Sequence, residues 1–567
     1  MLLTLLHPQV ARDFYESGFW REETFYSLLE KHVQASPETI CLRDSQHSLT
    51  WRQLLLWVDS FAFGLQELGL KPTDRVAVWL PSRVESIVAF LACSRNGYVC
   101  CPSLHQNYTT AEIAQLLNNC SAKALVAQKD YGIDANRHQL LEHKDQLGSL
   151  KAIYLVTSSD LKQSKETATK HFPSPLEQQF PELPTTKLTC VQNQLKPALK
   201  DPEAIVYLAF TSGTTGRPKG VMHSNNTLLA NGRAMVNDWS YPRGTVMLSL
   251  SPLSHHIGTV AVSQWLVGGF QLVLNDPSKK ISTTDWLIET NTNYAVGVPT
   301  HAIDILATMK SRGLNRLGRV SIFYMAGSLI PHEVGRQLLS FGIKPQNVYG
   351  MTENGSHQYT LPSDDLESIV QTCGRAAAGY ETRIVDQHNP DIYLPDGEIG
   401  EIATRGALLM LGYFGNQVAT ESSFNSDGWF LSGDLGQLDS KGRLRIMGRK
   451  KELIIRGGHN IFPSRIEDLA HQIPNILKVA VFALPDERLG EKVCLAVIFR
   501  VQQEMSADAL LLELFKMGLS KLDMPEYFTS LSSFPMTASG KTLKRTLKEL
   551  CVRGEVEVTP VRFVEPK

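Results

Sequence analysis

The sequence lacks the features of disulfide scaffolds and of nucleic-acid-binding chains. Its 567 residues include nine cysteines, an odd number, and no two of them form a CxxC pair. This pattern favours free thiols in a reducing compartment over a disulfide framework or a structural zinc site. Lysine and arginine (56) balance aspartate and glutamate (57), and no long basic block occurs. We therefore expect no nucleic-acid partner and no attraction to an acidic membrane.

Long apolar runs are also absent. The segment Met1–Leu6 has no positively charged stretch before it and is soon interrupted by Pro8, so we expect no signal peptide. No uninterrupted apolar run approaches the ~18–20 residues that a membrane span requires. The sequence therefore favours a cytoplasmic protein without a membrane span, and it does not reveal the oligomeric state.

What the chain does have is the composition of an ordinary globular protein, with 43% hydrophobic and 20% charged residues. Its length predicts two to four domains, because a single core rarely grows beyond ~250–300 residues. Short apolar runs alternate with helix-like segments, a pattern typical of α/β proteins with strands buried on both faces. We expect helices at 84–93 and 225–236, and strands at 76–80, 124–127, 205–210, 271–274, 295–298, 320–325, 479–484 and 493–499.

The composition changes toward the C-terminus. After about Gly400, glycine and charged residues become frequent and the alternation of strands and helices gives way to shorter turns. We therefore place a domain boundary near Arg449–Lys451. This predicts an N-terminal domain of residues 1–450 and a C-terminal domain of residues 451–567.

The segment Thr211–Gly220, Thr-Ser-Gly-Thr-Thr-Gly-Arg-Pro-Lys-Gly, directly follows the expected strand 205–210. It contains three glycines, four hydroxyl side chains and one lysine. Glycines expose backbone N–H groups, and the hydroxyls and the lysine add donors that suit a polyphosphate. A flexible surface loop is the alternative, but this composition directly after a buried strand favours phosphate binding.

Two common nucleotide-binding motifs are not present. The one GK[ST] sequence is Gly540-Lys541-Thr542, and Pro535 stands where a Walker A motif needs its first glycine. No GxGxxG follows an expected strand. A P-loop NTPase and a Rossmann dinucleotide enzyme are therefore disfavoured.

Six motifs follow one another along the chain: 211–220, Tyr349-Gly350-Met351-Thr352-Glu353, Ser432-Gly433-Asp434, Gly448-Arg449-Lys450-Lys451, Gly457-Gly458-His459-Asn460-Ile461 and Pro535–Lys541. In this order they resemble the adenylate-forming superfamily, which comprises acyl- and aryl-CoA synthetases, peptide-synthetase adenylation domains and luciferases. The resemblance covers nearly the whole chain. It implies an α/β fold in which a large N-terminal domain of α/β subdomains is followed by a smaller, mobile α+β C-terminal domain.

The resemblance also implies an ATP site. Tyr349 would offer its ring face to adenine, Thr352 would bond an α-phosphate oxygen, and Glu353 would hold Mg²⁺ against the phosphates. Asp434 would bind both ribose hydroxyls with help from Arg449, although an Asp beside glycine often bonds only its own backbone. The complete set implied for ATP and AMP is Thr211, Ser212, Gly213, Thr214, Thr215, Gly216, Lys219, Gly327, Ser328, Tyr349, Gly350, Thr352, Glu353, Asp434, Arg449 and Lys541.

The C-terminal motifs imply a mobile catalytic lysine. Lys541 would bring its ammonium to the reacting carboxylate and α-phosphate, and Lys219 and Glu353 complete the implied catalytic set. Lys451 occupies the position of the family's hinge residue, and Gly457 and Gly458 would line a tunnel for the thiol after rotation. Two further basic residues are expected to be ordinary solvated side chains: Lys544 and Arg545.

An acyl pocket is implied by two segments. The segment Ser251–Gly258 resembles the family's stretch around a histidine, here His255, but Ser254 replaces the usual aromatic residue. Gly258, Ala326 and Gly327 complete the implied pocket, and small residues there leave room for a substrate. No charged residue in these segments points to a second charge on the acid, which favours a fatty, alicyclic or aromatic carboxylate over an amino acid.

Together these expectations describe an AMP-forming acid–CoA ligase that uses ATP, Mg²⁺ and CoA. The acid would attack the α-phosphate, pyrophosphate would leave, and the thiol of CoA would capture the acyl-adenylate. Two alternatives remain open at this point. The adenylate could be delivered to a carrier-protein thiol, or the chain could be a nucleotide-binding homologue without catalysis.

Overall fold

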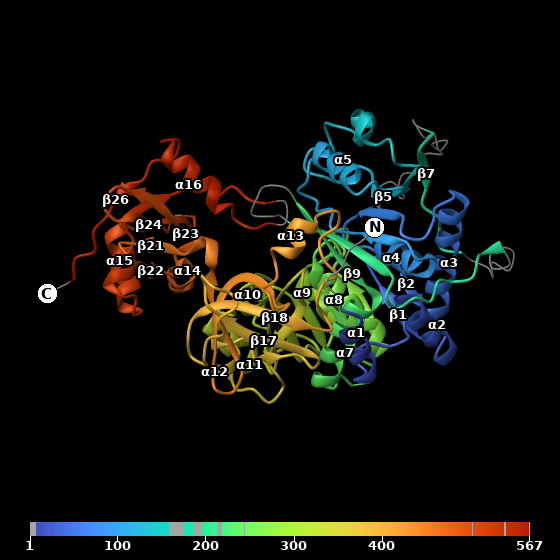
Figure 1. The fold of residues 1–567 in the computed structure, drawn as a ribbon, viewed down its shortest axis with the longest axis horizontal. Helices are drawn as coiled ribbons and strands as arrows, with labels where there is room; N and C mark the ends of the chain where they lie inside the picture. The colour runs from blue at the N-terminus through green and yellow to red at the C-terminus, as the bar shows by residue number, and fades with distance from the viewer. Residues whose placement is uncertain are drawn as a thin grey trace. The chain divides into compact units, whose positions relative to one another are not determined.

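The structure is a computed structural model. It describes residues 7–157, 175–184, 194–211, 218–242, 244–501, 503–537 and 540–565. The chain divides into two compact units (Figure 1): the first comprises Met1–Glu381 and Thr404–Phe424, and the second comprises Thr382–Ala403 and Asn425–Lys567. The domain boundary that we place after residue 450 lies inside the second unit. The hinge that we expect at this boundary stays a prediction.

The first unit is built on two mixed sheets. One has seven strands in the order β7-β6-β5-β3-β4-β8-β9, and the other has nine in the order β16-β15-β14-β13-β12-β10-β11-β1-β2. The strands of the seven-stranded sheet are β3 (Arg75–Trp79), β4 (Val99–Cys101), β5 (Ala124–Gln128), β6 (Ala152–Val156), β7 (Glu177–Gln179), β8 (Ile205–Thr211) and β9 (Lys219–Ser224). Those of the nine-stranded sheet are β1 (Ile40–Arg43), β2 (Ser48–Thr50), β10 (Val246–Ser249), β11 (Gln271–Leu274), β12 (Tyr294–Gly297), β13 (Ile322–Ala326), β14 (Lys344–Met351), β15 (Gly355–Tyr359) and β16 (Arg375–Ala376).

Both sheets are parallel in their interior, with antiparallel pairs only toward their ends, such as β8 with β9 and β14 with β15. The described helices of this unit are α1 (Pro8–Glu16), α2 (Phe25–Ala35), α3 (Trp51–Glu67), α4 (Val84–Asn96), α5 (Thr110–Asn119), α7 (Asn225–Trp239), α8 (His256–Gly268), α9 (Thr283–Glu289), α10 (Pro299–Ser311), α11 (His332–Ser340), α12 (Leu366–Gln371) and α13 (Gln417–Glu421). The predicted α/β class is therefore confirmed, as are the expected strands and helices of this region.

Alternation along the strands shows why the apolar runs are nearly continuous. In β3, Val76 and Val78 belong to a central core, whereas Ala77 and Trp79 belong to an outer core with α5. In the nine-stranded sheet, Tyr294 belongs to the same central core and Ala295 to another outer core. Helices α3, α4, α7 and α8 contribute to the central core, so both sheets bury both faces.

Two smaller sheets belong mostly to the second unit, although the first two residues of β17 and the last three of β18 fall within the bounds of the first unit. The first has the order β17-β18-β19-β20, and the second has the order β22-β21-β24-β25-β26 with β23 paired to β24. Their strands are β17 (Tyr380–Val385), β18 (Gly400–Gly406), β19 (Phe430–Leu438), β20 (Leu444–Arg449), β21 (Ile454–Arg456), β22 (His459–Ile461), β23 (Ile476–Asp486), β24 (Gly490–Phe499), β25 (Tyr527–Ser530) and β26 (Thr559–Pro560). The described helices are α14 (Pro463–Ala470), α15 (Ala507–Lys516) and α16 (Lys544–Val552).

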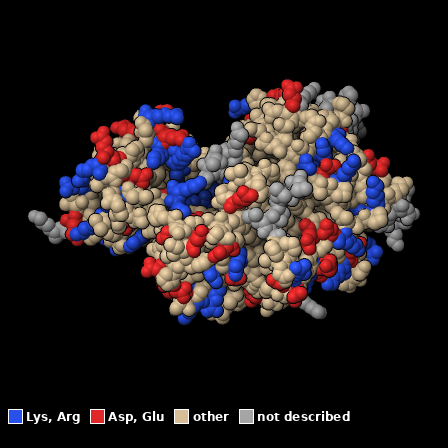
Figure 2. All heavy atoms as spheres, in the orientation of Figure 1, with Lys and Arg blue, Asp and Glu red and all other residues tan. Residues whose placement is uncertain are grey.

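Two expectations from composition can be compared with the described residues. Eight cysteines lie in them, and all eight are free and buried. Among these residues no helix has both the length and the apolar character needed to cross a bilayer. Figure 2 shows acidic and basic side chains interspersed over the visible surface, in keeping with the net charge of −1.

An ion pair lies inside the central core of the first unit. Arg95, near the end of α4, places Nε 2.9 Å from Oδ1 of Asp59 on α3, and both side chains are only 8% exposed. The hydroxyl of Tyr26 on α2 donates to the same carboxylate oxygen at 2.8 Å. Because both charges are removed from water, the loss of one leaves the other unpaired in the core.

We predict that Asp59→Ala destabilises the first unit by about 3–5 kcal/mol, because it leaves the Arg95 guanidinium buried without its partner. The matched control is Glu38→Ala, which breaks a pair with Arg52 at 2.6 Å whose side chains are 70% and 46% exposed. This control should cost about 0–1 kcal/mol. Thermal and denaturant unfolding of the two variants measures both losses, and equal losses would contradict the prediction.

Candidate functional site

The predicted phosphate loop connects the antiparallel strands β8 and β9. Thr211 ends β8, Lys219 begins β9, and the two residues are paired in the register. Helix α7 then begins at Asn225, as expected, with β9 between it and the loop. The remaining predicted loop residues lie outside the described part of the chain: Ser212, Gly213, Thr214, Thr215 and Gly216.

The segment 410–414 lies along the outer edge of β9. The backbone N–H of Leu411 donates to Met222 O at 2.9 Å, and that of Phe414 donates to Gly220 O at 2.7 Å. Between them, Tyr413 pairs with Val221 as an isolated bridge. The backbone of this segment is therefore fixed to the strand that carries Lys219.

Tyr413 joins two of the predicted catalytic residues. Its hydroxyl donates to Oε1 of Glu353 at 3.0 Å, and Nζ of Lys219 lies 4.4 Å from the centre of its ring. The backbone N–H of Met410 also donates to Glu353 O at 2.7 Å. Burial and the Glu353 carboxylate raise the pKa of Tyr413 well above its usual range, so its hydroxyl keeps its proton at neutral pH. The sequence analysis missed Tyr413, because one tyrosine after an apolar run carries no motif of its own.

The predicted motif 349–353 comprises the last three residues of β14 and the first two residues of the turn that leads to β15. The backbone N–H of Met351 donates to Oδ1 of Asn354 at 3.0 Å, which holds the turn from inside. A Cβ atom at Gly350 would overlap the carbonyl oxygen of Gly355, so this position requires glycine. The rings of Tyr349 and His357 form a T-shaped contact, with ring centroids 5.2 Å apart.

A buried histidine ties this turn to β9. Nε2 of His223 lies 2.6 Å from Thr352 O, and its Nδ1 lies 3.0 Å from Oγ1 of Thr227. Since a carbonyl oxygen only accepts, Nε2 carries the proton. Burial lowers the pKa of His223 to about 4, so the imidazole is neutral at physiological pH. His223 therefore links the strand of Lys219 to the backbone of Thr352, a second role that the sequence analysis missed.

The small residues Ala326, Gly327 and Ser328 lie at the carboxyl end of β13, next to β14 in the nine-stranded sheet. Ala326 ends β13 and pairs in parallel with Val348 of β14, one residue before Tyr349. The carboxyl ends of two neighbouring strands therefore bring 326–328 and Tyr349 together, as expected for ligand loops in an open sheet. The structure thus assembles this part of the predicted site.

The predicted acyl-site histidine lies at the start of α8. His255 is the residue before the helix, and its ring centroid is 4.5 Å from that of His105. Burial, together with His255, lowers the pKa of His105 to about 3, so His105 is neutral. A Cβ atom at Gly258 would overlap Pro252 O, so packing within this segment accounts for that glycine. The part of Gly258 in an acyl pocket stays a prediction.

In the second unit, Asp434 and Arg449 face each other. They are paired residues of β19 and β20, and Nε of Arg449 lies 3.4 Å from Oδ1 of Asp434. The Asp434 side chain is 11% exposed and that of Arg449 is 52% exposed. Ser432 Oγ accepts from Asp434 N at 3.1 Å. This contact joins the Ser432 hydroxyl to the Asp434 backbone, and it differs from the bond between the Asp434 carboxylate and its own backbone that we considered. The expected partnership of the two residues has a geometric basis.

Gly457 and Gly458 form the two-residue turn between β21 and β22. Their φ values are +57° and +86°, which suits glycine, and Arg456 pairs with His459 across the turn. The predicted hinge residue Lys451 lies six residues before Gly457, in the short 3-10 helix Lys450–Glu452.

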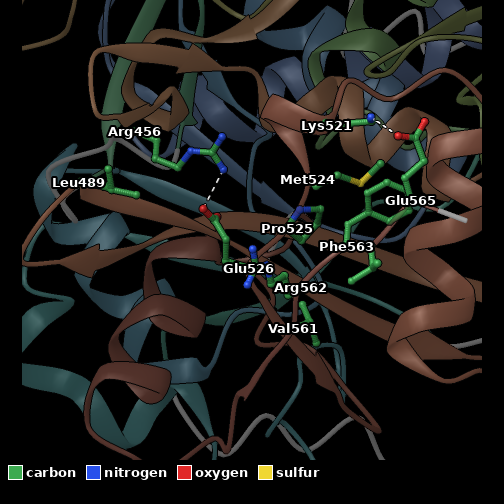
Figure 3. A pocket seen from close by; sticks show the side chains of 11 residues that line it. Arg456, Leu489, Lys521, Met524, Pro525, Glu526, Val561, Arg562, Phe563 and Glu565 are labelled. Carbon is green, nitrogen blue, oxygen red and sulfur yellow. Dashed lines mark hydrogen bonds and ion pairs between the residues drawn. The ribbon is translucent and has the colours of Figure 1, made fainter. Parts of the chain in front are cut away.

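A cavity of about 630 Å³ lies beside this turn (Figure 3). Figure 3 shows Arg456 paired with Glu526, at 2.7 Å, and Lys521 paired with Glu565. Gly457 N donates to the carbonyl of Leu489, another lining residue, at 2.8 Å. Arg562 adds a third cation to the lining, so the cavity carries one more basic than acidic side chain.

Lys541 is held by a hydrogen-bonded loop. Thr537 N donates to Lys541 O at 2.7 Å, and Lys541 N donates back to Oγ1 of Thr537 at 2.9 Å. Met536 and Thr542 form an isolated bridge one residue outside this pair. The structure therefore groups the predicted residues in two sets. Thr211, Lys219, Gly327, Tyr349 and Glu353 belong to the first unit, and Asp434, Arg449, Gly457 and Lys541 belong to the second.

Comparison with known proteins gives the family. The model of the family described as "AMP-binding enzyme" matches residues 29–414. The chain is 30% identical to the medium-chain fatty-acid–CoA ligase of Escherichia coli, over 98% of this chain and 95% of that protein. It is 28% identical to the 2-hydroxy-7-methoxy-5-methyl-1-naphthoate–CoA ligase of Streptomyces carzinostaticus, over 95% of both chains.

Solved structures agree on the fold. ATP-bound MatB from Rhodopseudomonas palustris superposes with a TM-score of 0.76 at 24% identity, over 92% of this chain and 98% of that chain. The expected fold is therefore confirmed. The family match, the full-length relatives and the ordered motifs lead to one conclusion: the chain belongs to the AMP-binding enzyme family of the adenylate-forming superfamily.

Proposed function

We propose that the protein is an AMP-forming acid–CoA ligase, which activates a carboxylic acid as acyl-AMP and then transfers the acyl group to CoA. The observation that carries the proposal is the group formed by Lys219, Glu353 and Tyr413. It places a cation and a carboxylate beside β9, the strand that follows the predicted phosphate loop. Full-length relatives named as acid–CoA ligases support the same activity.

The residues around the phosphate loop suit ATP with Mg²⁺. Lys219 offers a cation to the phosphates, and Thr352 offers a hydroxyl to the α-phosphate. Mg²⁺ is usually bound by one or two carboxylates together with substrate phosphates, and the Glu353 carboxylate, oriented by Tyr413, fits that donor set. The bound metal would neutralise phosphate charge. Asp434 and Arg449 would hold the ribose, since an ionised carboxylate accepts from both hydroxyls.

The two half-reactions need different residues. In the first, the ammonium of Lys541 would offset the repulsion between the acid and the triphosphate. In the second, rotation about Lys451 would exchange Lys541 for the turn Gly457–Gly458, past which the thiol reaches the adenylate. The cavity beside this turn, with its excess of one cation, suits the phosphates of CoA.

The acid is proposed to be a fatty, alicyclic or aromatic carboxylate, bound near His255, Gly258, Ala326 and Gly327. The named substrates of the E. coli and Streptomyces relatives, a medium-chain fatty acid and a naphthoate, belong to these classes. We further propose a cytoplasmic location, because buried free thiols such as those of this chain are typical of reducing compartments.

Exchange of labelled pyrophosphate into ATP tests the first step. We expect exchange only in the presence of a suitable acid from a panel of fatty, alicyclic and aromatic carboxylates, and CoA-dependent AMP release with the same acid. The absence of exchange with every acid would favour a nucleotide-binding homologue without catalysis. Thioester formation on a carrier protein, with CoA inert, would instead select the carrier-loading alternative.

The role of Lys541 predicts a split between the half-reactions. Lys541→Ala should lower acid-dependent pyrophosphate exchange about 100- to 1,000-fold, by analogy with the loss of one oxyanion-hole donor. Thioester formation from supplied acyl-AMP and CoA should change little. The control is Arg545→Ala, since this side chain is 77% exposed and pairs within its own helix. Normal exchange in Lys541→Ala would exclude the assigned role.

The role of Tyr413 predicts a change in the metal requirement. Tyr413→Phe removes the hydrogen bond to Glu353 and keeps the ring beside Lys219. We expect a loss of about tenfold in adenylation at limiting Mg²⁺, since a hydrogen bond to a charged group contributes about 1.5 kcal/mol or more. Excess Mg²⁺ should restore part of the rate. Tyr393→Phe, which removes a hydroxyl bonded to Asp427 at 2.5 Å, is the control and should leave the Mg²⁺ dependence unchanged.

A further inference from the structure

Lys544, three residues after Lys541, is not the solvated lysine that we expected. Its side chain is 19% exposed, and its Nζ lies 2.6 Å from Oε2 of Glu452 and 2.9 Å from Oε1 of Glu467. The expectation was right for the next residue, Arg545, which is 77% exposed and pairs with Glu549 one turn along α16. The two neighbouring cations therefore have different environments.

The position of Lys544 is electrostatically unfavourable without these partners. It is the first residue of α16, where the positive end of the helix dipole disfavours a cation. Burial also disfavours its charge, yet the carboxylates of Glu467 and Glu452 outweigh the effect of burial and raise the pKa of Lys544 above its usual value. Asp468, which is next to Glu467 on α14, has its pKa raised to about 7 by burial and by the Glu467 charge. The cation is thus fixed by a group of acidic side chains, and not by its own helix.

The partners of Lys544 belong to two structurally distinct segments. Glu452 is the last residue of the 3-10 helix Lys450–Glu452, directly after the proposed hinge residue. Glu467 lies on α14, and its Oε1 also accepts from Val481 N on β23 at 2.7 Å. Lys544 therefore connects the hinge segment to helix α14. This helix is in turn hydrogen-bonded to β23, which pairs with β24 along most of its length.

On its N-terminal side, Lys544 is preceded by the loop that carries Lys541. Thr537 and Lys541 close this loop through two hydrogen bonds, and Leu543 N donates to Pro535 O at 2.8 Å just before Lys544. These bonds join the two ends of the loop, and their partners all lie within residues 535–543. The ion pairs of Lys544 follow directly after this loop, and they bind this part of the chain to two segments far away in the sequence.

We propose that Lys544 is a positioning residue, whose ion pairs with Glu452 and Glu467 hold the Lys541 loop at a fixed place relative to the hinge segment. The inference rests on the proposed function, in which Lys541 serves adenylation and moves with the hinge. A rotation about Lys451 then delivers Lys541 to the same point in each cycle. Placement matters, because a displacement of about 1 Å can cost 100-fold in rate.

The test is Lys544→Met in the full chain, which removes the charge and keeps an unbranched stem. We expect kcat for acid-dependent pyrophosphate exchange to fall about 10- to 100-fold with little change in KM for ATP. Thioester formation from supplied acyl-AMP and CoA should stay within about twofold, because that step does not use Lys541. Lys544→Arg keeps the charge and should restore much of the exchange rate.

The matched control is Lys548→Met, one turn further along α16, where the side chain is 39% exposed and its Nζ is 3.7 Å from Glu491. It should leave both half-reactions unchanged. Glu452→Gln tests the same connection by a milder change that keeps the Glu467 partner, and a smaller loss confined to pyrophosphate exchange is expected.

Hydrogen exchange separates this inference from the proposed function, since it does not depend on activity. The amides of Lys541 and Leu543 should exchange faster in Lys544→Met than in the wild type or in Lys548→Met, because the loop opens more often without its anchor. Unchanged protection of these amides would overturn the inference. An equal loss in both half-reactions, with a lowered unfolding midpoint, would also overturn it in favour of a purely structural role. Absence of adenylation in the wild type would overturn the proposed function. The hydrogen-exchange measurement would still show whether Lys544 anchors the Lys541 loop.

Discussion

The pairing of the segment 410–414 with β9 is the interaction on which the arrangement of the residues that we predict to bind phosphate depends. Lys219 and Glu353 come from different sheets of the first unit, and Tyr413 contacts both. His223 adds a second connection, from β9 to the backbone of Thr352. A lysine and a carboxylate that are far apart in the sequence are thus held by neutral, buried partners that do not titrate near physiological pH.

Much of the fold could be predicted from the sequence, because the signal is physical and local. Strands such as β3 and β12 are buried on both faces, so their buried residues are apolar on both sides of the strand. The helix after β3 begins at Val84, as predicted. Gly350 is similarly constrained by the backbone beside it. The six ordered motifs also predicted which segments form the site. Each motif consists of residues that are neighbours in the chain, so it can be identified without the fold.

The rest could not be predicted, because it depends on contacts between distant segments. Tyr413 lies 60 residues from Glu353, and nothing around it distinguishes it from a core tyrosine. Lys544 and Arg545 are adjacent and chemically alike, yet only the fold decides that one meets Glu452 and Glu467 while the other faces solvent. The side chains that support a site leave a weaker signal in the sequence than those that contact the substrate.

The burial of the cysteines has a chemical consequence for an enzyme that makes thioesters. A thiolate on the surface of such a protein would compete with CoA for the activated acyl group and would also attack the finished product. The eight described cysteines are all buried, and burial raises the pKa of Cys373 to about 12, so its thiol stays protonated. By keeping these eight thiols out of solvent, the chain limits their acylation by the thioester it releases.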